Sequence, residues 1–464
     1  MAPTGATSLS QRGGWTEPAG SAGSRATRRH LLAAMPAAGL LGPLAVIAAC
    51  GRAAPGQQAT GATSEHVTLQ HLDWWVPNTP VHQTYFNGIK KEFEAKYPNV
   101  TVDYIFVSGT SGVREKWIAL TAGGTPHDTS QVSVAFVRDL MVNNLLEPLD
   151  GYIAKTRTMD LKEFVDAGMF YNTYQNKHYG IPYDGPSTNV IAYNIVHFKE
   201  VGLDPSPNFT WKWTNDQFLD AARRLVKNDG GKVIRGGFAP PGLSVAGYLP
   251  WLYANGGDFY DKDYKRVLLN DAKGRGALQF VLDLRDKYKL AAEVDGAALE
   301  NEGYSMVVSG SWTAGYFLDK NPQLQWGYAP LPKGPMGAHP ASMTWTNMWS
   351  IARPSGHKDV AWNWITYVNS EETLERYFAG VYKRAAARKA FYQSAAWKAV
   401  LKEFPALENV EKIADLSKEY PWVKNSELES ETKDTWQKIQ NHELGVNDGL
   451  AQIEQIGNRL LAAG

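Results

Sequence analysis

Segments typical of strands alternate with segments typical of amphipathic helices near the start of the folded part of this chain. Residues 67–75 and 100–106 have the composition and alternation of strands. Between them, residues 80–97 place Phe86 and Phe93 on one helical face. Because parallel strands need long crossover connections, which are usually helices, this rhythm predicts an α/β fold with a parallel core sheet.

The same rhythm continues beyond residue 106. Residues 114–122 predict a short helix closed by Gly123 and Gly124, and the alternation of apolar residues over 132–136 predicts a third strand. Residues 140–149 predict a helix followed by an extended exit.

An export signal precedes these segments. The pair Arg28–Arg29 opens a mostly apolar run that ends at Cys50. A positive start, an apolar run and small residues before a cleavage point are typical of an export signal, and adjacent arginines followed by leucines resemble a twin-arginine signal. A membrane-spanning helix is the alternative. The run is near the lower length limit for a span, however, and contains Pro36 and Pro43.

The small residues directly before Cys50 resemble a bacterial lipobox, in which the cysteine becomes the lipidated N-terminus. We therefore expect residues 1–49 to be a signal peptide and residues 50–65 a lipidated, flexible tether. Cys50 is the only cysteine, so the folded part has no disulfide and needs a hydrophobic core. The roughly 415 remaining residues suggest two or three domains.

Two later segments are extended and rich in Pro, Gly or Thr, which suits crossings between domains. They are residues 179–187 and residues 343–351. Thr214 and Gln217 have the spacing of a capping box before a helix, and residues 306–308 form a short buried strand pattern. The tail from Pro405 onward is largely helical in pattern.

Four segments together resemble the family 1 extracellular solute-binding proteins, the sugar-binding receptors of ATP-binding-cassette importers. The resemblance covers residues 66–464 and rests on the order and spacing of the segments, which are residues 93–100, 120–128, 179–203 and 307–332. The chain departs from the family pattern at His127, which is inserted before Asp128. It also lacks the proline that usually precedes an arginine near Arg384, which leaves the role of Arg384 open.

The resemblance implies a periplasmic-binding-protein type II-like fold, in which two α/β lobes joined by hinge crossings enclose a ligand cleft. Lobe 1 would comprise residues 66–183 and 346–388, and lobe 2 would comprise residues 184–345 and 389–464. The third crossing, near residues 385–395, follows from the resemblance alone. Closure about the hinge around a ligand is the expected motion.

Open α/β sheets present ligands at the carboxyl ends of their strands, and that rule selects the first group of candidate ligand-binding residues. Aromatic rings stack on sugars, and short polar side chains accept hydrogen bonds from sugar hydroxyls or donate hydrogen bonds to them. The group comprises Trp74, Trp75, Ser108, Thr110, Ser111, Asp128, Trp312 and Trp345. Each strand-end tryptophan has core packing as its alternative role. Trp312 is the strongest candidate, because Gly-Ser-Trp also matches the family motif at a cleft position.

Four further candidates come from the crossing, from a glycine pair and from the resemblance. Tyr183 and Asp184 lie in the first crossing, where hinge hydrogen bonding is an equal alternative. The backbone of Gly257 would approach the ligand, or the glycine would serve only to form a turn. Trp436 lies on a late helix whose counterpart in related receptors faces the cleft.

A secreted glycoside hydrolase acting on oligosaccharides is the alternative function. It needs two carboxylates across the scissile bond, and Asp73, Asp128, Asp184 and Asp258 offer candidates. The sequence contains no nucleophile elbow, no His-Glu-x-x-His and no phosphate-binding loop. Scattered histidines argue against a metal site, and we expect no cofactor.

The sequence therefore predicts a binding protein and not an enzyme. It would be the extracytoplasmic component of a carbohydrate importer, held by Cys50 at the outer face of the cytoplasmic membrane. Its partners would be a sugar, with a di- or oligosaccharide as the expected class, and the membrane permease. A net charge of zero gives no argument for nucleic acid, and we expect a monomer. Relatives of this fold also take polyols and glycerol phosphodiesters, so the ligand class stays open.

Overall fold

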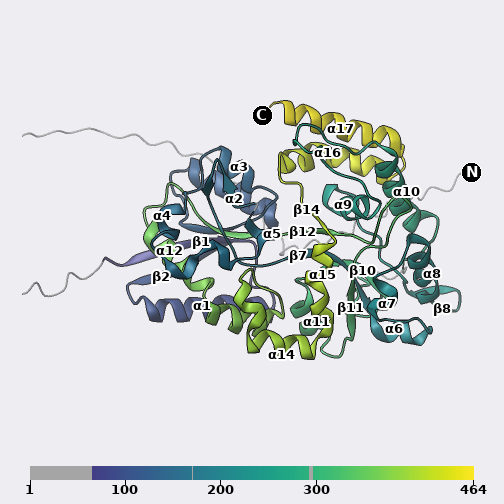
Figure 1. The fold of residues 1–464 in the computed structure, drawn as a ribbon, viewed down its shortest axis with the longest axis horizontal. Helices are drawn as coiled ribbons and strands as arrows, with labels where there is room; N and C mark the ends of the chain where they lie inside the picture. Colours follow the sequence, from purple (N-terminus) through teal and green to yellow (C-terminus); the bar gives the residue numbers. More distant parts are fainter. Residues whose placement is uncertain (1–64, 170, 292–295, 464) are drawn as a thin grey trace, which may run out of the picture.

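The protein folds into two α/β lobes that lie side by side along the long axis of the molecule (Figure 1). The structure is a computed structural model and describes residues 65–169, 171–291 and 296–463. The predicted signal peptide and Cys50 lie outside the described residues, so export and lipidation stay predictions. Among the helices of the described residues, none is both long and apolar enough to cross a bilayer.

The first lobe is built on a five-stranded sheet with the order β2-β1-β3-β13-β6. Its strands are β1 (Val67–Asp73), β2 (Val100–Phe106), β3 (Thr129–Val132), β6 (Ile181–Pro182) and β13 (Met348–Ile351). β1 pairs in parallel with both β2 and β3, whereas β13 runs antiparallel to β3 and β6. The predicted parallel core is therefore confirmed for β1, β2 and β3.

Helices and a small hairpin complete lobe 1. They are α1 (Pro80–Lys96), α2 (Gly109–Ala122), α3 (Val137–Val142), α4 (Asp150–Ile153), η1 (Arg157–Met159), η2 (Leu161–Glu163), α5 (Asp166–Met169), β4 (Thr173–Tyr174), β5 (Lys177–His178), α12 (Lys358–Val368), α13 (Glu371–Leu374) and η3 (Glu375–Tyr382).

Three boundaries in lobe 1 differ from the prediction. α2 begins at Gly109, five residues before the predicted start, so Thr110 and Ser111 lie in its first turn. β3 covers residues 129–132 instead of 132–136. The predicted long helix over 140–149 is only α3. The β3 error has a physical cause, because Thr129, Ser130 and Gln131 are polar yet fully buried, which hides the strand from a hydrophobic pattern.

The second lobe is built on an antiparallel sheet. Its strands are β7 (Ser187–Asn194), β10 (Met306–Gly310), β11 (Trp326–Ala329), β12 (Met343–Trp345) and β14 (Lys418–Glu419). β7 pairs antiparallel with β10, β11 and β12, and only β12 and β14 pair in parallel.

Lobe 2 carries most of the remaining helices. They are α6 (Ile195–Glu200), α7 (Pro207–Thr210), α8 (Asn215–Leu225), α9 (Val245–Ala254), α10 (Ala272–Asp286), α11 (Ala314–Lys320), η4 (Lys389–Gln393), α14 (Ala395–Glu403), η5 (Pro405–Glu408), α15 (Asn409–Asp415), α16 (Asn425–Gln440) and α17 (Val446–Ala462), with the hairpin β8 (Lys227–Asp229) and β9 (Lys232–Arg235). The predicted capping box is confirmed at the start of α8, where Thr214 and Gln217 bond reciprocally.

The chain passes between the two sheets at three places that lie against one another. It leaves β6 for β7 through residues 183–186, and it leaves β12 for β13 through residues 346–347. Near the third passage, Ala386 forms an isolated bridge with Asp184. The lobes therefore connect through three adjacent segments, an arrangement that suits a hinge.

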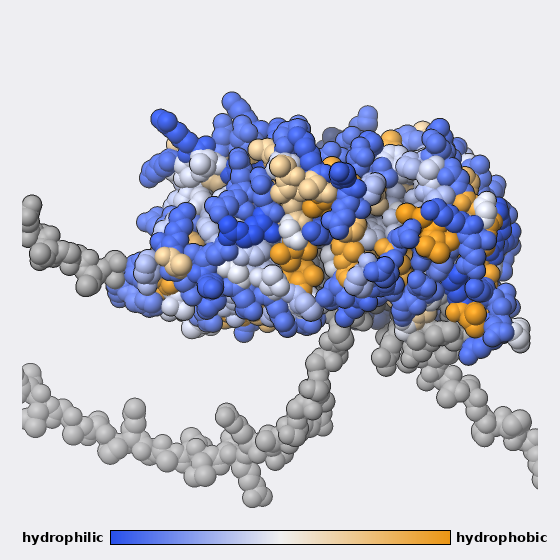
Figure 2. All heavy atoms as spheres, turned by 90° about the horizontal axis from the view of Figure 1, so that it is seen from below, coloured by the Kyte–Doolittle hydropathy of each residue, from blue (hydrophilic) through white to orange (hydrophobic). Residues whose placement is uncertain are grey.

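Aromatic side chains fill much of both cores. Trp117, Trp349 and Trp364 are fully buried in lobe 1, and Trp213 and Trp436 are fully buried in lobe 2. The face of the molecule seen in Figure 2 is mostly hydrophilic, with hydrophobic residues gathered in several small groups.

Candidate ligand site between the lobes

The strand directions fix which sheet edges face each other. β6 leads directly into the first crossing, so the carboxyl ends of β1, β2 and β3, which run parallel to β6, lie at the edge of sheet 1 toward lobe 2. In the second sheet β7 starts from that crossing. Its antiparallel partners β10 and β12 therefore end at the edge toward lobe 1, and β14 ends there with them. Residues that follow these strands line the space between the lobes.

Three aromatic rings form a continuous wall on the lobe 2 side of this space. Trp312 follows β10, Trp345 ends β12 and Tyr420 follows β14. The ring centroids of Trp312 and Trp345 lie 5.2 Å apart at 61°, and those of Trp345 and Tyr420 lie 5.9 Å apart at 62°. Both tryptophans are partly exposed. We call Trp312, Trp345 and Tyr420 the lobe 2 wall.

Gly310 makes room for the Trp312 ring. A Cβ atom built on Gly310 would lie 2.1–2.2 Å from three atoms of that ring, far inside van der Waals contact. The ring therefore folds back over the backbone of β10, and the glycine of the Gly-Ser-Trp motif is needed for its position.

Trp75 occupies the corresponding place in lobe 1, but it is packed on several sides. His82 stacks on its indole at 5.9 Å and 7°, the Tyr382 ring lies 5.1 Å away, and the Arg384 guanidinium lies 5.2 Å from its ring centroid. Trp75 is only 8% exposed. Burial also lowers the pKa of His82, which keeps the stacked imidazole neutral at pH 7. The surroundings of Trp75 suit packing beside the hinge more than open ligand contact.

The other candidates at the lobe 1 edge are the buried Trp74 and three more exposed residues at the start of α2. Trp74 is 9% exposed. Ser108 and Ser111 are exposed and Thr110 is half-buried, all at the start of α2. These four residues follow β1 and β2 at the sheet edge toward lobe 2, and their contact with a ligand stays a prediction.

Asp184 joins all three crossings through its carboxylate. Oδ1 accepts hydrogen bonds from the Asn347 amide at 2.7 Å and from the Thr346 hydroxyl at 3.1 Å. Oδ2 accepts from the Ser187 hydroxyl at 2.9 Å, and it forms an ion pair with Arg384. Asp184 is fully buried and Arg384 is 7% exposed.

This network favours hinge hydrogen bonding over ligand contact for Asp184. It also gives Arg384 a role that the sequence left open, because its guanidinium connects the third crossing to the first. Tyr183 is likewise fully buried, with its ring 4.6 Å from that of Trp349, and burial raises the pKa of its phenol. In this conformation Tyr183 presents no surface to a ligand.

The predicted placement of Asp128 needs correction. Asp128 precedes β3, so it lies at the amino end of the parallel strands, the edge of the sheet opposite to Trp74. Its carboxylate accepts hydrogen bonds from the Gln70 amide at 2.9 Å and from the Ser355 hydroxyl at 2.6 Å. Asp128 is 3% exposed and serves the packing of lobe 1.

Gly257 and Trp436 also lie in the interior of lobe 2. The Gly257 amide donates to Leu252 at 2.9 Å, and its carbonyl accepts from Lys418 Nζ at 2.7 Å, so both backbone groups are used within the lobe. Trp436 is 1% exposed and packs 5.5 Å from the Tyr248 ring. Their burial corrects the expectation that these residues reach the cleft.

The sequence reasoning missed Tyr420. Strand β14 has only two residues, so no hydrophobic alternation marks it. Tyr420 is held by backbone pairing to Thr344 at 3.0 Å and by a hydrogen bond from Asn425 to its hydroxyl at 2.8 Å. A signal was available only in the cluster of aromatic residues around residues 420–422.

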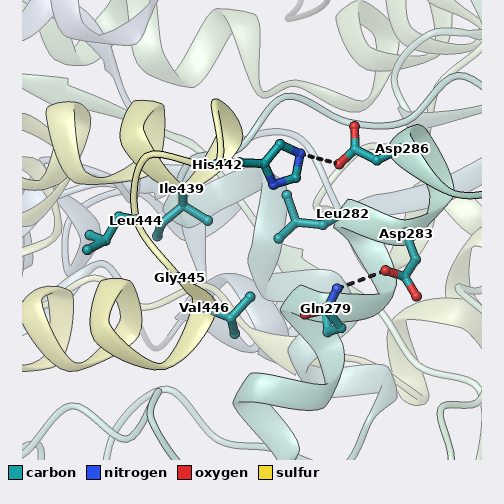
Figure 3. Close-up of a pocket in the computed structure, with 9 residues that line it drawn as sticks. All are labelled: Gln279, Leu282, Asp283, Asp286, Ile439, His442, Leu444, Gly445 and Val446. Carbon is teal, nitrogen blue, oxygen red and sulfur yellow. Dashed lines mark hydrogen bonds and ion pairs between the residues drawn. The ribbon is translucent and has the colours of Figure 1, made fainter.

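A surface cavity of about 200 Å³ lies elsewhere on lobe 2, between α10 and the connection from α16 to α17 (Figure 3). Its carboxylates are paired, since Asp286 contacts His442 at 3.0 Å and Asp283 accepts from Gln279 at 2.8 Å. Within the described residues, no three His, Cys, Asp or Glu side chains gather in a way that could hold a metal ion.

Comparison with known proteins agrees with this architecture. A family model described as bacterial extracellular solute-binding protein matches residues 77–375. An uncharacterized ABC transporter extracellular-binding protein of Pyrococcus horikoshii is 26% identical over 373 residues, covering 75% of this chain and 78% of the relative.

Solved structures show the same fold at low sequence identity. An ABC substrate-binding protein of Listeria monocytogenes in complex with cycloalternan has a TM-score of 0.75 at 18% identity, covering 86% of this chain and 100% of that chain. A maltose/maltodextrin-binding domain of Bdellovibrio bacteriovorus bound to maltotriose has a TM-score of 0.73 at 18% identity, covering 85% and 100%.

Proposed function

Because this chain belongs to the bacterial extracellular solute-binding protein family, we propose that it captures a carbohydrate and delivers it to the permease of an ABC importer. The ligand would enter between the lobes, contact both, and favour their closure. A ligand shifts that equilibrium only by its higher affinity for the closed state. The structural neighbours in complex with cycloalternan and with maltotriose support an oligosaccharide as ligand.

The lobe 2 wall is the observation that carries this proposal. Trp312, Trp345 and Tyr420 present aromatic surface at the sheet edge that faces lobe 1, where flat rings match the apolar faces of sugar rings. Trp74 and the polar side chains of Ser108, Thr110 and Ser111 would complete the site from lobe 1 and bind hydroxyl groups.

The pairing of three aspartates supports an uncharged ligand. Asp73 contacts His71 at 3.1 Å, Asp184 pairs with Arg384, and Asp258 pairs with Lys418 at 2.5 Å. Each of these charges already has a partner within the protein. A glycerol phosphodiester would need a free cation, which these pairs do not supply. A neutral di- or oligosaccharide suits the site better.

The same pairing weighs against the hydrolase alternative. General acid and nucleophile carboxylates must reach the scissile bond from two sides. Asp184 is buried in the hinge, and Asp128 lies at the opposite sheet edge. Assay of new reducing ends after incubation with oligosaccharides tests this point, and turnover would contradict the receptor function.

Cys50 would anchor the receptor beside its permease. A lipidated cysteine followed by a flexible tether raises the effective concentration of the folded lobes at the partner. More than one acyl chain is needed for stable anchoring. Cys50→Ser should release the protein from membranes and leave ligand affinity unchanged, as measured by membrane fractionation and calorimetry.

A thermal-shift screen tests the proposed function directly. A ligand that binds only the folded protein stabilises it by about 2.7 kcal/mol at a hundred times its Kd. We expect one or more neutral oligosaccharides to raise the Tm and a glycerol phosphodiester to leave it unchanged. A panel of oligosaccharides without any effect, or a shift given only by the phosphodiester, would contradict the proposal.

A further inference from the structure

A segment of lobe 2 reaches lobe 1 beside the candidate site. The Ser426 hydroxyl donates to the carbonyl of Ala135 at 2.8 Å, and the Tyr171 hydroxyl donates to the carbonyl of Tyr420 at 3.3 Å. Ala135 lies in the turn after β3, at the sheet edge that faces lobe 2. These bonds therefore join the two lobes outside the three crossings.

Arg138 on α3 lies at the centre of this contact. Its guanidinium carbon is 4.2 Å from the ring centroid of Tyr174 and 5.2 Å from that of Trp422, both within the range of cation–π attraction. Burial lowers the pKa of Arg138, but an arginine side chain keeps its charge in proteins.

The two rings belong to different lobes. Tyr174 lies in the β4–β5 hairpin, which is bound to α4 of lobe 1 by hydrogen bonds between His178 and Asp150. Trp422 follows β14 and is 8% exposed. Arg138 thus contacts the Tyr174 ring of its own lobe and the Trp422 ring of lobe 2.

The neighbouring ion pairs do not make the same connection. Arg114 pairs with Asp139 at 3.0 Å within lobe 1, and Lys424 pairs with Glu427 at 3.4 Å within lobe 2. Each pair joins residues of the same lobe, so these two contacts survive when the lobes separate. The cation–π contact between Arg138 and Trp422 joins the two lobes, so it is lost when they separate.

We propose that Arg138 is a latch: its guanidinium, held between Tyr174 and Trp422, stabilises the closed arrangement of the lobes. A consequence is that Arg138 raises the ligand affinity from outside the lobe 2 wall, because apparent affinity scales with the fraction of binding-competent protein. The consequence rests on the proposed function. The latch itself does not.

Interlobe distances in the ligand-free protein test the latch. With Cys50→Ser as background, Glu115→Cys on α2 and Lys433→Cys on α16 place one spin label on an exposed position of each lobe. Arg138→Ala should move the distance distribution by electron–electron double resonance toward longer distances. An unchanged distribution would overturn the proposal.

Arg223→Ala is the matched control. The Arg223 guanidinium lies 4.7 Å from the Tyr288 ring, and both residues belong to lobe 2. Its loss removes a similar cation–π contact within one lobe and should leave the interlobe distance unchanged. A shift as large as that of Arg138→Ala would mean that the distances report general loosening and would overturn the latch.

Trp422→Leu gives a second, independent variant. It should produce a shift at least as large as that of Arg138→Ala, because the Trp422 ring also contacts the Tyr171 ring of lobe 1 edge-on at 6.1 Å. The double variant should shift no further than Trp422→Leu, because both changes remove the same cation–π contact. Additive shifts would contradict a joint action of the two side chains.

Affinity for maltotriose, the trisaccharide bound by a structural neighbour, separates the latch from the proposed function. Arg138→Ala should weaken maltotriose binding by about twofold to thirtyfold in calorimetry. Equal affinity despite longer distances would overturn the consequence for binding. Absence of maltotriose binding in the unmodified protein would count against this sugar as ligand, and the distance measurement would still decide the latch.

Discussion

The two sides of the candidate site carry tryptophans in opposite environments. In lobe 1, Trp75 is enclosed by His82, Tyr382 and Arg384 beside the hinge. In lobe 2, Trp312 and Trp345 are partly exposed and contact each other edge-on. The same residue type at equivalent strand ends thus supports the hinge in one lobe and offers free aromatic surface in the other.

This difference explains why a rule based on strand ends selects too many residues. The rule selects a sheet edge, but it does not distinguish a ring that is already packed from one that is open. The surrounding residues decide, and two of those around Trp75, Tyr382 and Arg384, lie about 300 positions later in the chain.

The largest expected effect belongs to the hinge beside Trp75. Asp184→Ala leaves the guanidinium of Arg384 buried without its partner. Breaking a buried ion pair in this way costs about 3–5 kcal/mol, so the free energy of unfolding from urea denaturation should fall by that amount. A loss below about 1 kcal/mol would show that the network does not hold the crossings together.

Truncation of the two tryptophans should separate the lobes' roles. Trp75→Ala should lower the free energy of unfolding by about 3–5 kcal/mol, as for large-to-small changes in cores. Trp312→Ala should cost clearly less in the same urea titration, because its ring is partly exposed. Equal losses of unfolding free energy in the two variants would contradict the difference between the two tryptophan environments.

Acid should destabilise the protein through a buried histidine of lobe 1. Burial lowers the pKa of His127 to about 3, so the folded state keeps this imidazole neutral where the unfolded chain, with a pKa near 6.5, binds a proton. The stabilisation is present above pH 6.5 and is lost as the pH falls toward 3. At pH 5 the loss is about 2 kcal/mol.

His127→Phe removes the imidazole that binds a proton in the unfolded chain, and it is the control for the pH dependence. The free energy of unfolding of this variant should depend less on pH between 7 and 4. Burial also lowers the pKa of His197 in lobe 2, to about 4, so part of the slope should remain. An unchanged slope would contradict the assignment to His127.

Gly310→Ala should give the smallest effect. The added methyl group displaces the Trp312 ring without removing it, because the Cβ atom would overlap three ring atoms. We expect roughly tenfold weaker oligosaccharide binding, equivalent to about 1.4 kcal/mol, with measurement by calorimetry. Full affinity would show that the folded-back position of Trp312 does not matter.

Much of the fold was predictable from the sequence because it depends on local patterns. The alternation in β2, the amphipathic face of α1 and the capping box of α8 are all short-range signals, and the structure contains each of them. β3 was misplaced because its buried residues are polar, and β14 was missed because it is only two residues long.

The site was only partly predictable because its assembly depends on long-range contacts. The parallel pairing of β3 with β1 decides that Asp128, which precedes β3, lies at the opposite edge from Trp74, which follows β1. Tyr420 joins Trp345 across 75 residues, and Arg384 reaches Asp184 across 200. Such partners become visible only when both lobes are in place.

The measurement that tests the account most directly is calorimetric titration of Trp312→Ala with the oligosaccharide that gives the largest thermal shift. A stacked tryptophan contributes on the order of 1 kcal/mol beyond its buried area, so affinity should fall by roughly tenfold to a few hundredfold. The account predicts this loss in a variant that keeps a cooperative unfolding transition. Unchanged affinity would contradict it, because the lobe 2 wall would then not hold the ligand.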